Sequence, residues 1–346
     1  MPEMNALVWE DVNTVELRRK PVPEPQPGEA LLRIHNAGIC GSDLGVYAGV
    51  HPRAQAPLVM GHEFSGEVVR TNPRAGDEIG AAFSAGDRVV VEPLISCGHC
   101  RACRSGNAYV CENLALYGID RDGAFAEYVS VALDRLYRVP DELDSRTAAL
   151  TEPTAVAVHA VRRSPYKPGD SAVVLGGGPI GTLIALVLEL NGCDNVVVSE
   201  PREYRQALLR KLDIDVIDAA SGDPVQAARQ AVGGSGADVV FEVAGVDATA
   251  AQATAIASVL GTIVVVAVPK HPLAWDDVAI SFKELTLTGT RVYAPFDFER
   301  ALALLARNAE LFRPLLSDPF ALEQGGRAFE MAKAGDQVMR AVFEVR

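Results

Sequence analysis

The sequence lacks several features that would each indicate a class of protein. Its first residues, MPEMNALVWEDV, carry acidic side chains and no basic stretch, so we expect no secretory signal there. One long apolar stretch, residues 171–190, is interrupted by GGGPIG, which predicts a buried strand followed by a helix rather than a membrane span. Acidic residues outnumber basic residues by 45 to 32, and the net charge of −13 argues against binding to nucleic acid or to an anionic membrane.

The pattern of apolar residues changes along the chain. With 346 residues, two domains are expected. Between residues 30 and 139 the apolar runs are short, rich in β-formers and separated by Gly and Pro, which predicts a mainly β, partly open barrel-like domain. From about residue 147, strands such as SAVVLGG and NVVVSEP alternate with helices such as REYRQALLRKL, and TAAQATAIASVL is also predicted to be helical. This alternation predicts a doubly wound α/β domain with a parallel sheet.

Four cysteines follow the spacing C-x2-C-x2-C-x7-C within residues 97–111. Four thiolates on one short loop can surround a zinc ion as a tetrahedron, which predicts a structural zinc site. Disulfides are one alternative, but they need an oxidising compartment and a cytoplasmic location is expected here. An iron–sulfur cluster is another alternative, but the cysteine spacings of ferredoxins differ from this spacing. The predicted ligands are Cys97, Cys100, Cys103 and Cys111.

The GGGPIG segment places Gly176, Gly178 and Gly181 in the pattern G-x-G-x-x-G between a predicted strand and a predicted helix. Such a turn lets the backbone approach a pyrophosphate, and the helix N-terminus attracts its charge. Glu200 ends the next strand, where an acidic side chain binds ribose hydroxyls and repels a 2′-phosphate. We therefore predict NAD as the coenzyme, although Arg202 and Arg205 follow closely. The predicted coenzyme-binding residues are Gly176, Gly178, Pro179, Ile180, Gly181, Glu200, Arg205 and Val268.

A second metal site is predicted from residues that are separated along the chain. Cys40 lies in AGICGSDLGVY, His62 and Glu63 lie in MGHEFSG, and Glu152 lies in LTEPTAV. Any one of these alone would more often be structural, but together they supply sulfur, nitrogen and oxygen ligands and leave a position open, as catalytic zinc sites do. Ser42, two residues after Cys40, is a candidate to pass on a proton.

The combination of GICGSD, GHE, the four-cysteine segment, TEP and GGGPIG resembles the zinc-dependent medium-chain alcohol dehydrogenases, and within them the butanediol, sorbitol and threonine dehydrogenase group. The resemblance implies a catalytic domain formed by residues 1–150 and 291–346 around a Rossmann coenzyme domain of residues 151–290. It implies that Cys40 and His62 bind zinc, with Glu63 or Glu152 binding the metal or its water. It also implies a homo-oligomer, a dimer or a tetramer, joined through the coenzyme domain.

The chain departs from the family pattern at a few positions. Gly45 stands where these enzymes commonly carry a relay histidine, so protons should leave through the coenzyme ribose and water, or through His51 if the loop folds back. Val46 and Val292 stand where sorbitol-type enzymes tend to carry Tyr and Arg, which argues against long polyols.

The predicted function is hydride transfer between a small secondary alcohol or vicinal diol and NAD, with two zinc ions per chain. A polyol, a sugar acid and L-threonine stay open as alternative substrates. A zinc-free reductase of the same fold would lack the set Cys40, His62 and Glu152. A zinc-ribbon binding module, which would recognise nucleic acid or a protein partner, is disfavoured by the acidic charge of the chain.

Overall fold

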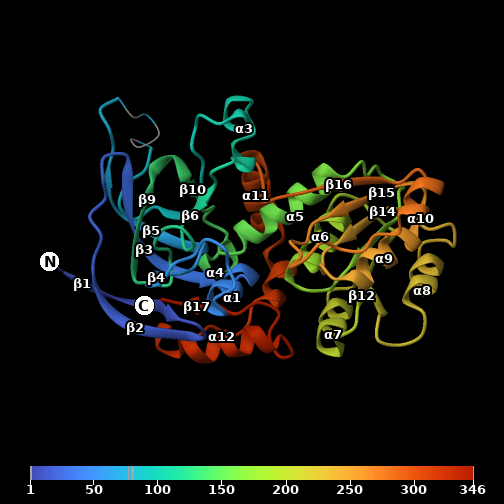
Figure 1. Cartoon of the computed structure of the whole chain (residues 1–346). Coiled ribbons are helices and arrows are strands. Elements are labelled where there is room, and N and C mark those ends of the chain that lie inside the picture. Colours follow the sequence, from blue (N-terminus) through green and yellow to red (C-terminus); the bar gives the residue numbers. More distant parts are fainter. Residues whose placement is uncertain (1, 77, 79–81, 346) are drawn as a thin grey trace. The chain divides into compact units, whose positions relative to one another are not determined.

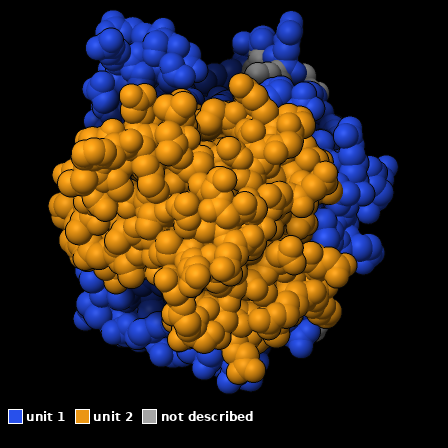
Figure 2. Space-filling view, turned by 90° about the vertical axis from the view of Figure 1, so that its right-hand side faces the viewer, with its two compact units in different colours: residues 1–152, 294–346 blue, residues 153–293 orange. Residues whose placement is uncertain are grey.

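The computed structural model describes residues 2–76, 78 and 82–345, and the chain forms two compact units (Figure 1). Unit 1 consists of Met1–Glu152 together with Ala294–Arg346, and unit 2 consists of Pro153–Tyr293 (Figure 2). Among the described residues, no helix is both long enough and apolar enough to cross a membrane.

Unit 1 is built mainly from antiparallel strands. Strand β3 pairs with three partners, β5, β9 and β17, and so lies at the centre of the larger sheet. The strands of unit 1 are β1 (Glu3–Asp11), β2 (Thr14–Pro21), β3 (Glu29–Gly38), β4 (Leu58–Val59), β5 (Glu63–Asn72), β6 (Arg88–Val91), β7 (Leu94–Ile95), β8 (Ala115–Leu116), β9 (Tyr128–Ala132), β10 (Leu136–Arg138) and β17 (Val342–Glu344). The predicted mainly β domain is therefore confirmed.

Among the residues that the structure describes, the helices of unit 1 are short except near the end of the chain. They are α1 (Gly41–Tyr47), α3 (Arg101–Arg104), α4 (Ser145–Ala148), α11 (Pro295–Phe312) and α12 (Gly325–Ala334). The C-terminal segment belongs to unit 1 because its aromatic side chains enter the same core. Phe125 packs edge-on against Phe343, with ring centroids 4.9 Å apart, and against Phe329 at 6.0 Å. Such aromatic pairs add about 0.5–1.5 kcal/mol beyond the area that they bury.

Unit 2 is a six-stranded parallel sheet, as predicted. Its strands are β11 (Ala172–Leu175), β12 (Val196–Glu200), β13 (Asp215–Asp218), β14 (Ala237–Glu242), β15 (Ala257–Val265) and β16 (Thr286–Gly289). The strands alternate with helices α5 (Thr151–Arg163, which begins at the end of unit 1), α6 (Pro179–Leu190), α7 (Glu203–Lys211), α8 (Pro224–Ala231), α9 (Asp247–Ile256) and α10 (Asp277–Phe282). Strand β11 is buried along its whole length, which explains its unbroken apolar run.

The strand order in unit 2 is β13-β12-β11-β14-β15-β16. The chain therefore moves outward from β11 in one direction and then returns to continue in the other. Dinucleotides bind at the carboxyl ends of the strands where this reversal occurs. The loop after β11 and the end of β12 consequently lie at the expected binding edge.

One element differs from the sequence prediction. The segment TAAQATAIASVL was predicted to be helical to its end, but α9 ends at Ile256 and Ala257–Leu260 belong to β15. Ala257 pairs with Ala237 of β14, and a bulge follows before Thr262 pairs with Val239. A run of small apolar residues fits a helix and a strand equally well, so periodicity alone could not place this boundary.

Candidate functional site

A cluster of potential metal ligands lies in unit 1. Ligand atoms of Cys40, His62 and Glu63 all lie within 4.8 Å of one another. Cys40 caps the N-terminus of α1 just after β3, and His62 directly precedes β5. Because β3 and β5 are antiparallel and Gly38 pairs with Glu63, the end of one strand meets the start of the other. Sheet register thus brings together residues that are distant along the chain.

His62 is held between two polar neighbours and is buried. Its Nδ1 lies 3.4 Å from Oδ1 of Asp43, and its Nε2 lies 3.4 Å from the hydroxyl of Ser42. Burial alone would lower the pKa of His62, but the charges of Asp43 and Cys40 outweigh it and raise the pKa well above 6.5. The site therefore favours positive charge at this imidazole.

Sequence reasoning missed Asp43. This residue is fully buried, and its Oδ2 accepts a hydrogen bond of 2.8 Å from the backbone N–H of Cys40. A carboxylate beside the second nitrogen of a histidine fixes the ring orientation of metal-binding histidines. The signal in the sequence was an acidic residue three positions after Cys40 at the start of a helix, where it completes the helix cap.

Arg340 was also missed, and it forms an ion pair with Glu63. Its Nε donates to Oε2 of Glu63 at 2.8 Å, and its Nη2 donates to Oε1. Both side chains are buried. Gly38 makes room for this pair, because a Cβ at that position would lie 2.8 Å from Oε2 of Glu63. No local sequence motif marks Arg340, since it reaches Glu63 from the C-terminal segment.

Glu152 lies outside the three-residue cluster. It is the second residue of α5 and is 6% exposed. Its charge is one of those that raise the pKa of Arg340, after the opposing effect of burial and the larger contribution of Glu63. The carboxylate is therefore near the site, and its role as a zinc ligand stays a prediction.

The residues of this cluster fit a zinc ion. A thiol, an imidazole and a carboxylate are the ligand types of catalytic zinc sites. The negative charges of Asp43 and Cys40, which raise the pKa of His62, would also attract a metal cation beside its ring. Cys40, His62 and Glu63 are thus the side chains that could hold the metal.

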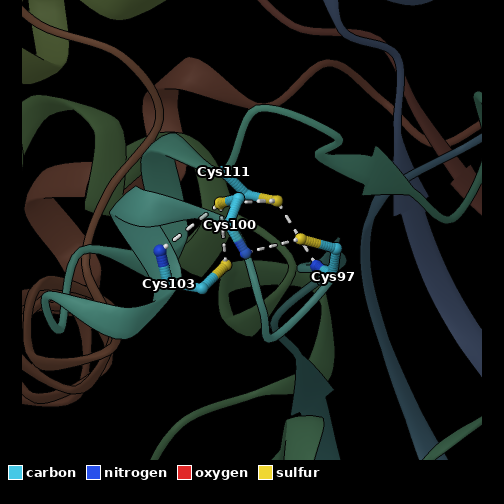
Figure 3. A group of neighbouring side chains, drawn as sticks. All are labelled: Cys97, Cys100, Cys103 and Cys111. Carbon is cyan, nitrogen blue, oxygen red and sulfur yellow. Dashed lines mark hydrogen bonds between the residues drawn. The ribbon is translucent and has the colours of Figure 1, made fainter.

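A second cluster consists of four cysteines, called the lobe cysteines below, whose sulfur atoms point toward one another: Cys97, Cys100, Cys103 and Cys111 (Figure 3). Sγ of Cys100 lies 3.4 Å from Sγ of Cys103 and 3.8 Å from Sγ of Cys111. A tetrahedron with zinc–sulfur bonds of about 2.3 Å has sulfur atoms about 3.8 Å apart. All four thiols are free, so no disulfide competes.

Backbone N–H groups support the lobe cysteines. The N–H of Cys97 donates to Sγ of Cys111 at 3.3 Å, and the N–H of Cys100 donates to Sγ of Cys97 at 3.4 Å. Hydrogen bonds from the backbone of His99 and Cys100 lower the pKa of the Cys97 thiol to about 6. Thiolates are the form that binds zinc, so these hydrogen bonds favour metal binding at Cys97, whereas burial raises the pKa of the Cys103 thiol to about 11.

A pocket in unit 2 surrounds the GGGPIG loop. Its volume is about 580 Å³, which is within the range of small-molecule and cofactor sites. Every coenzyme residue predicted from the sequence lines it: Gly176, Gly178, Pro179, Ile180, Gly181, Glu200, Arg205 and Val268. The third glycine is required, because a Cβ on Gly181 would lie 1.8 Å from the carbonyl oxygen of Gly176.

The loop after α1 folds back toward Gly45. The backbone N–H groups of Val50 and His51 both donate to the carbonyl oxygen of Gly45, at 3.0 and 3.2 Å. The imidazole of His51 is turned toward its own loop, where Nδ1 accepts from the N–H groups of Arg53 and Ala54. His51 thus lies near Gly45, the position where family members carry the relay histidine. Its Nδ1 already accepts hydrogen bonds from its own loop.

The chain is similar to known protein families and to individual proteins. Residues 26–141 match the profile of the alcohol dehydrogenase GroES-like domain, and residues 179–307 match that of the zinc-binding dehydrogenases. The 2-dehydro-3-deoxy-L-galactonate 5-dehydrogenase of Pseudoalteromonas atlantica is 39% identical over 92% of both chains.

Solved structures match nearly the whole chain. A zinc-binding dehydrogenase of Sinorhizobium meliloti 1021, bound to NADP, has a TM-score of 0.91 and 32% identity, covering 99% of this chain and 100% of the other. The 2R,3R-butanediol dehydrogenase of Bacillus subtilis has a TM-score of 0.89 and 31% identity, covering 99% of both.

Proposed function

Because the chain belongs to the zinc-containing medium-chain alcohol dehydrogenase family, we propose that it transfers a hydride between a small secondary alcohol or vicinal diol and NAD. As a family member it is an oxidoreductase that acts on CH–OH groups with a nicotinamide coenzyme and zinc. The identity of the substrate and the choice of NAD as coenzyme are what we propose beyond the family's activity.

The cluster of Cys40, His62 and Glu63 is the observation that carries the proposal. A structural zinc site alone would support a binding module as well as an enzyme. A second, mixed set of ligands beside a serine hydroxyl supports catalysis, because the hydroxyl of Ser42 lies 3.4 Å from Nε2 of His62.

The roles of the residues follow from their chemistry. Cys40 and His62 would hold the catalytic zinc, with Glu63 or Glu152 as a further oxygen ligand, and the four lobe cysteines would hold the structural zinc. When bound, the catalytic zinc would lower the pKa of the substrate hydroxyl as a Lewis acid, while NAD accepts the hydride. Ser42 would take the hydroxyl proton on its Oγ and give up its own proton toward solvent. Asp43 would keep the His62 ring oriented.

A substrate panel tests the proposal. The zinc-loaded protein should be assayed for NAD reduction with vicinal diols, polyols, sugar acids and L-threonine, and a secondary alcohol within a vicinal diol should give the highest kcat/KM. The Cys40→Ser variant serves as the control, since it should fold and bind NADH without turnover. The proposal fails if the wild-type protein binds zinc and NADH but oxidises no member of the panel.

A sugar acid is a second candidate substrate. The relative from Pseudoalteromonas atlantica, whose name gives a galactonate derivative as its substrate, is 39% identical over 92% of this chain. A sugar acid also contains vicinal hydroxyl groups, so the same zinc chemistry applies. A preference for galactonate-type acids over uncharged diols of similar length would select this candidate.

A further inference from the structure

Three arginines line one cavity at an end of the larger sheet of unit 1. Glu29, the first residue of β3, pairs with the last residue of β5 on one side and with the last residue of β9 on the other. Arg74 follows the end of β5 and Arg135 follows the end of β9, so the register of the sheet brings both to the same place. Arg121, from the segment before β9, joins them around a cavity of about 620 Å³, which is within the range of small-molecule sites.

The acidic groups around this cavity are already engaged. Nη1 of Arg135 lies 3.2 Å from Oε1 of the buried Glu92, and its Nε lies 3.5 Å from Oδ1 of Asp134. The carboxylate of Glu29 is held by its own end of the sheet, because its Oε2 accepts a hydrogen bond of 2.9 Å from the N–H of Gln26. Arg135 is therefore the arginine of the three whose charge is already balanced.

The other two guanidinium groups, those of Arg74 and Arg121, have no ion-pair partner among residues 2–76, 78 and 82–345. The guanidinium of Arg74 lies against the backbone of Gly28, where a Cβ would be 3.1 Å from its Nε. The carbonyl oxygen of Arg121 accepts a hydrogen bond of 2.7 Å from the N–H of Gly118, which fixes the turn from which its side chain extends. Two unpaired guanidinium groups beside the single carboxylate of Glu29 leave hydrogen-bonding capacity for an anion.

A smaller cavity of about 230 Å³ adjoins the first one. Glu29, Tyr117 and Arg121 line both cavities, so the two share a boundary. Lys20 and Asp122 also line the smaller cavity but form an ion pair of 2.6 Å with each other. Buried apolar side chains line it as well, among them Met4, Val59, Ala126 and Val129. Because an apolar cavity of about 150 Å³ accommodates benzene, this one has room for a ring of that size.

The hydroxyl of Tyr117 lies at the boundary of the two cavities. Its oxygen accepts a hydrogen bond of 3.1 Å from the N–H of Ala132. Burial raises the pKa of Tyr117, and the charges of Glu29, Arg121 and Arg135 also act on it, so the hydroxyl is protonated at pH 7 and lies near these three groups. Within the described part of the chain, no acceptor lies within hydrogen-bonding distance of its own O–H, which leaves this proton for a ligand.

We propose that the two cavities form one binding site for a small organic anion, whose phosphate or carboxylate group lies between Arg74 and Arg121 and whose apolar group fills the smaller cavity. Arginine binds both kinds of anion through paired, charge-assisted hydrogen bonds. The hydroxyl of Tyr117 donates to the same anion at the boundary. None of the described residues that line these cavities belongs to a metal cluster or to the unit 2 pocket, so the inference does not rest on the proposed function.

The test compares phenyl phosphate, benzoate and inorganic phosphate by isothermal titration calorimetry on the full, zinc-loaded chain, with NADH present at saturation so that the unit 2 pocket is filled. Phenyl phosphate should bind with a stoichiometry of one and at least about tenfold more tightly than inorganic phosphate, because its ring leaves water. Equal affinities, or no binding of phenyl phosphate, overturn the inference. Tighter binding of phenyl phosphate than of benzoate identifies organic phosphates as the ligand class, and the reverse identifies carboxylates.

Variants assign the binding to this site. Arg121→Ala and Arg74→Ala should each weaken phenyl phosphate by about tenfold, in line with the loss of a charge-assisted hydrogen bond, and Arg121→Lys should restore part of the affinity. Arg327→Ala is the matched control, because Arg327 is an exposed arginine of α12 in unit 1 that lines neither cavity.

Zinc content and NADH affinity should be the same in all of these variants. Unchanged binding of phenyl phosphate in Arg121→Ala, or an equal loss in Arg327→Ala, overturns the assignment and places the anion elsewhere, the catalytic metal cluster included. If NADH itself fails to bind to the folded wild-type protein, the dinucleotide part of the proposed function fails. The comparison of Arg121→Ala with Arg327→Ala still decides the present inference in that case.

Discussion

Arg340 and Glu63 form a two-point ion pair that joins the C-terminal segment to the candidate metal cluster. Both partners are buried, with exposures of 4% and 0%. Burial opposes the charge on Arg340, but the attraction of Glu63 outweighs it and the pKa of Arg340 is raised. The pair therefore holds Glu63 in place beside Cys40 and His62.

Removing Arg340 should destabilise unit 1. Arg340→Met leaves a buried carboxylate without its partner, which typically costs about 3–5 kcal/mol. Urea unfolding followed by the fluorescence of Trp9 in a Trp275→Phe background reports on unit 1, because these are the two tryptophans of the chain. The Glu63→Gln/Arg340→Met double variant should recover part of the loss. A change below about 1 kcal/mol in Arg340→Met would contradict this account.

Two zinc ions per chain with different roles are expected from the two ligand clusters. Cys100→Ser should lower stability or assembly, because it breaks the four-thiolate lobe. Cys40→Ser should fold, retain about one zinc and lose turnover. Metal analysis of freshly prepared protein, supplied with zinc throughout purification, checks the count. Fewer than two sites in fully loaded wild-type protein would be inconsistent with the two-site interpretation.

The clusters differ in how well the sequence predicts them, for a physical reason. The lobe cysteines are neighbours along the chain, so their spacing alone restricts them to one loop. Cys40 and His62 are distant along the chain, so they were predicted from their ligand types and from the family resemblance of the segments around them. The motif GICGSD includes Asp43 but does not show its contact with His62, and no motif includes Arg340. Both contacts depend on burial and on sheet register.

Register explains the missed arginine. Gly38 pairs with Glu63 of β5 on one side of β3 and with Val342 of β17 on the other. Arg340 therefore reaches Glu63 because two strands far apart in the sequence flank the same strand. No periodicity within RAVFEVR shows which strand it will join. The alternation of strands and helices in unit 2 was predictable because each βαβ step is local.

An oligomer joined through unit 2 is expected from the free edge of its sheet. Strand β16 is the last strand in the order, and among the described residues it pairs with β15 alone. Nearby apolar side chains are exposed, among them Leu260 at 68% and Phe282 at 86%. Edges and apolar patches of this kind are usually covered. Light scattering should show a dimer or a tetramer.

Phe282→Glu should shift that assembly toward smaller species. Val12→Glu is the control, because Val12 is an exposed apolar residue of unit 1 and its replacement should leave the assembly unchanged. A monomer in the wild-type protein at micromolar concentration would count decisively against the interface, as would equal effects of the two substitutions.

The last prediction concerns the proton path from Ser42. The loop folds back so that His51 lies near Gly45, which is the condition under which this histidine could replace the missing relay residue. However, Nδ1 of His51 accepts backbone N–H groups at 3.2 and 3.3 Å and is therefore unprotonated, so the neutral ring carries its proton on Nε2.

A ring in this state has no free nitrogen with which to accept a proton. Burial lowers the pKa of His51 below 6.5, and the charge of Arg53 acts in the same direction, so the ring is neutral at pH 7. We therefore expect water to carry the proton, and His51→Ala should change kcat by less than about tenfold, whereas a relay residue contributes about 10²–10⁴-fold.

Gly45→His should be tolerated or mildly activating, because a Cβ at Gly45 meets no atom within 4 Å. The measurements are pH profiles of kcat for both variants, with zinc content and NADH affinity as controls. A loss of about 10²-fold or more in His51→Ala with both controls intact would mean that the imidazole turns away from its loop during turnover and receives the proton from Ser42.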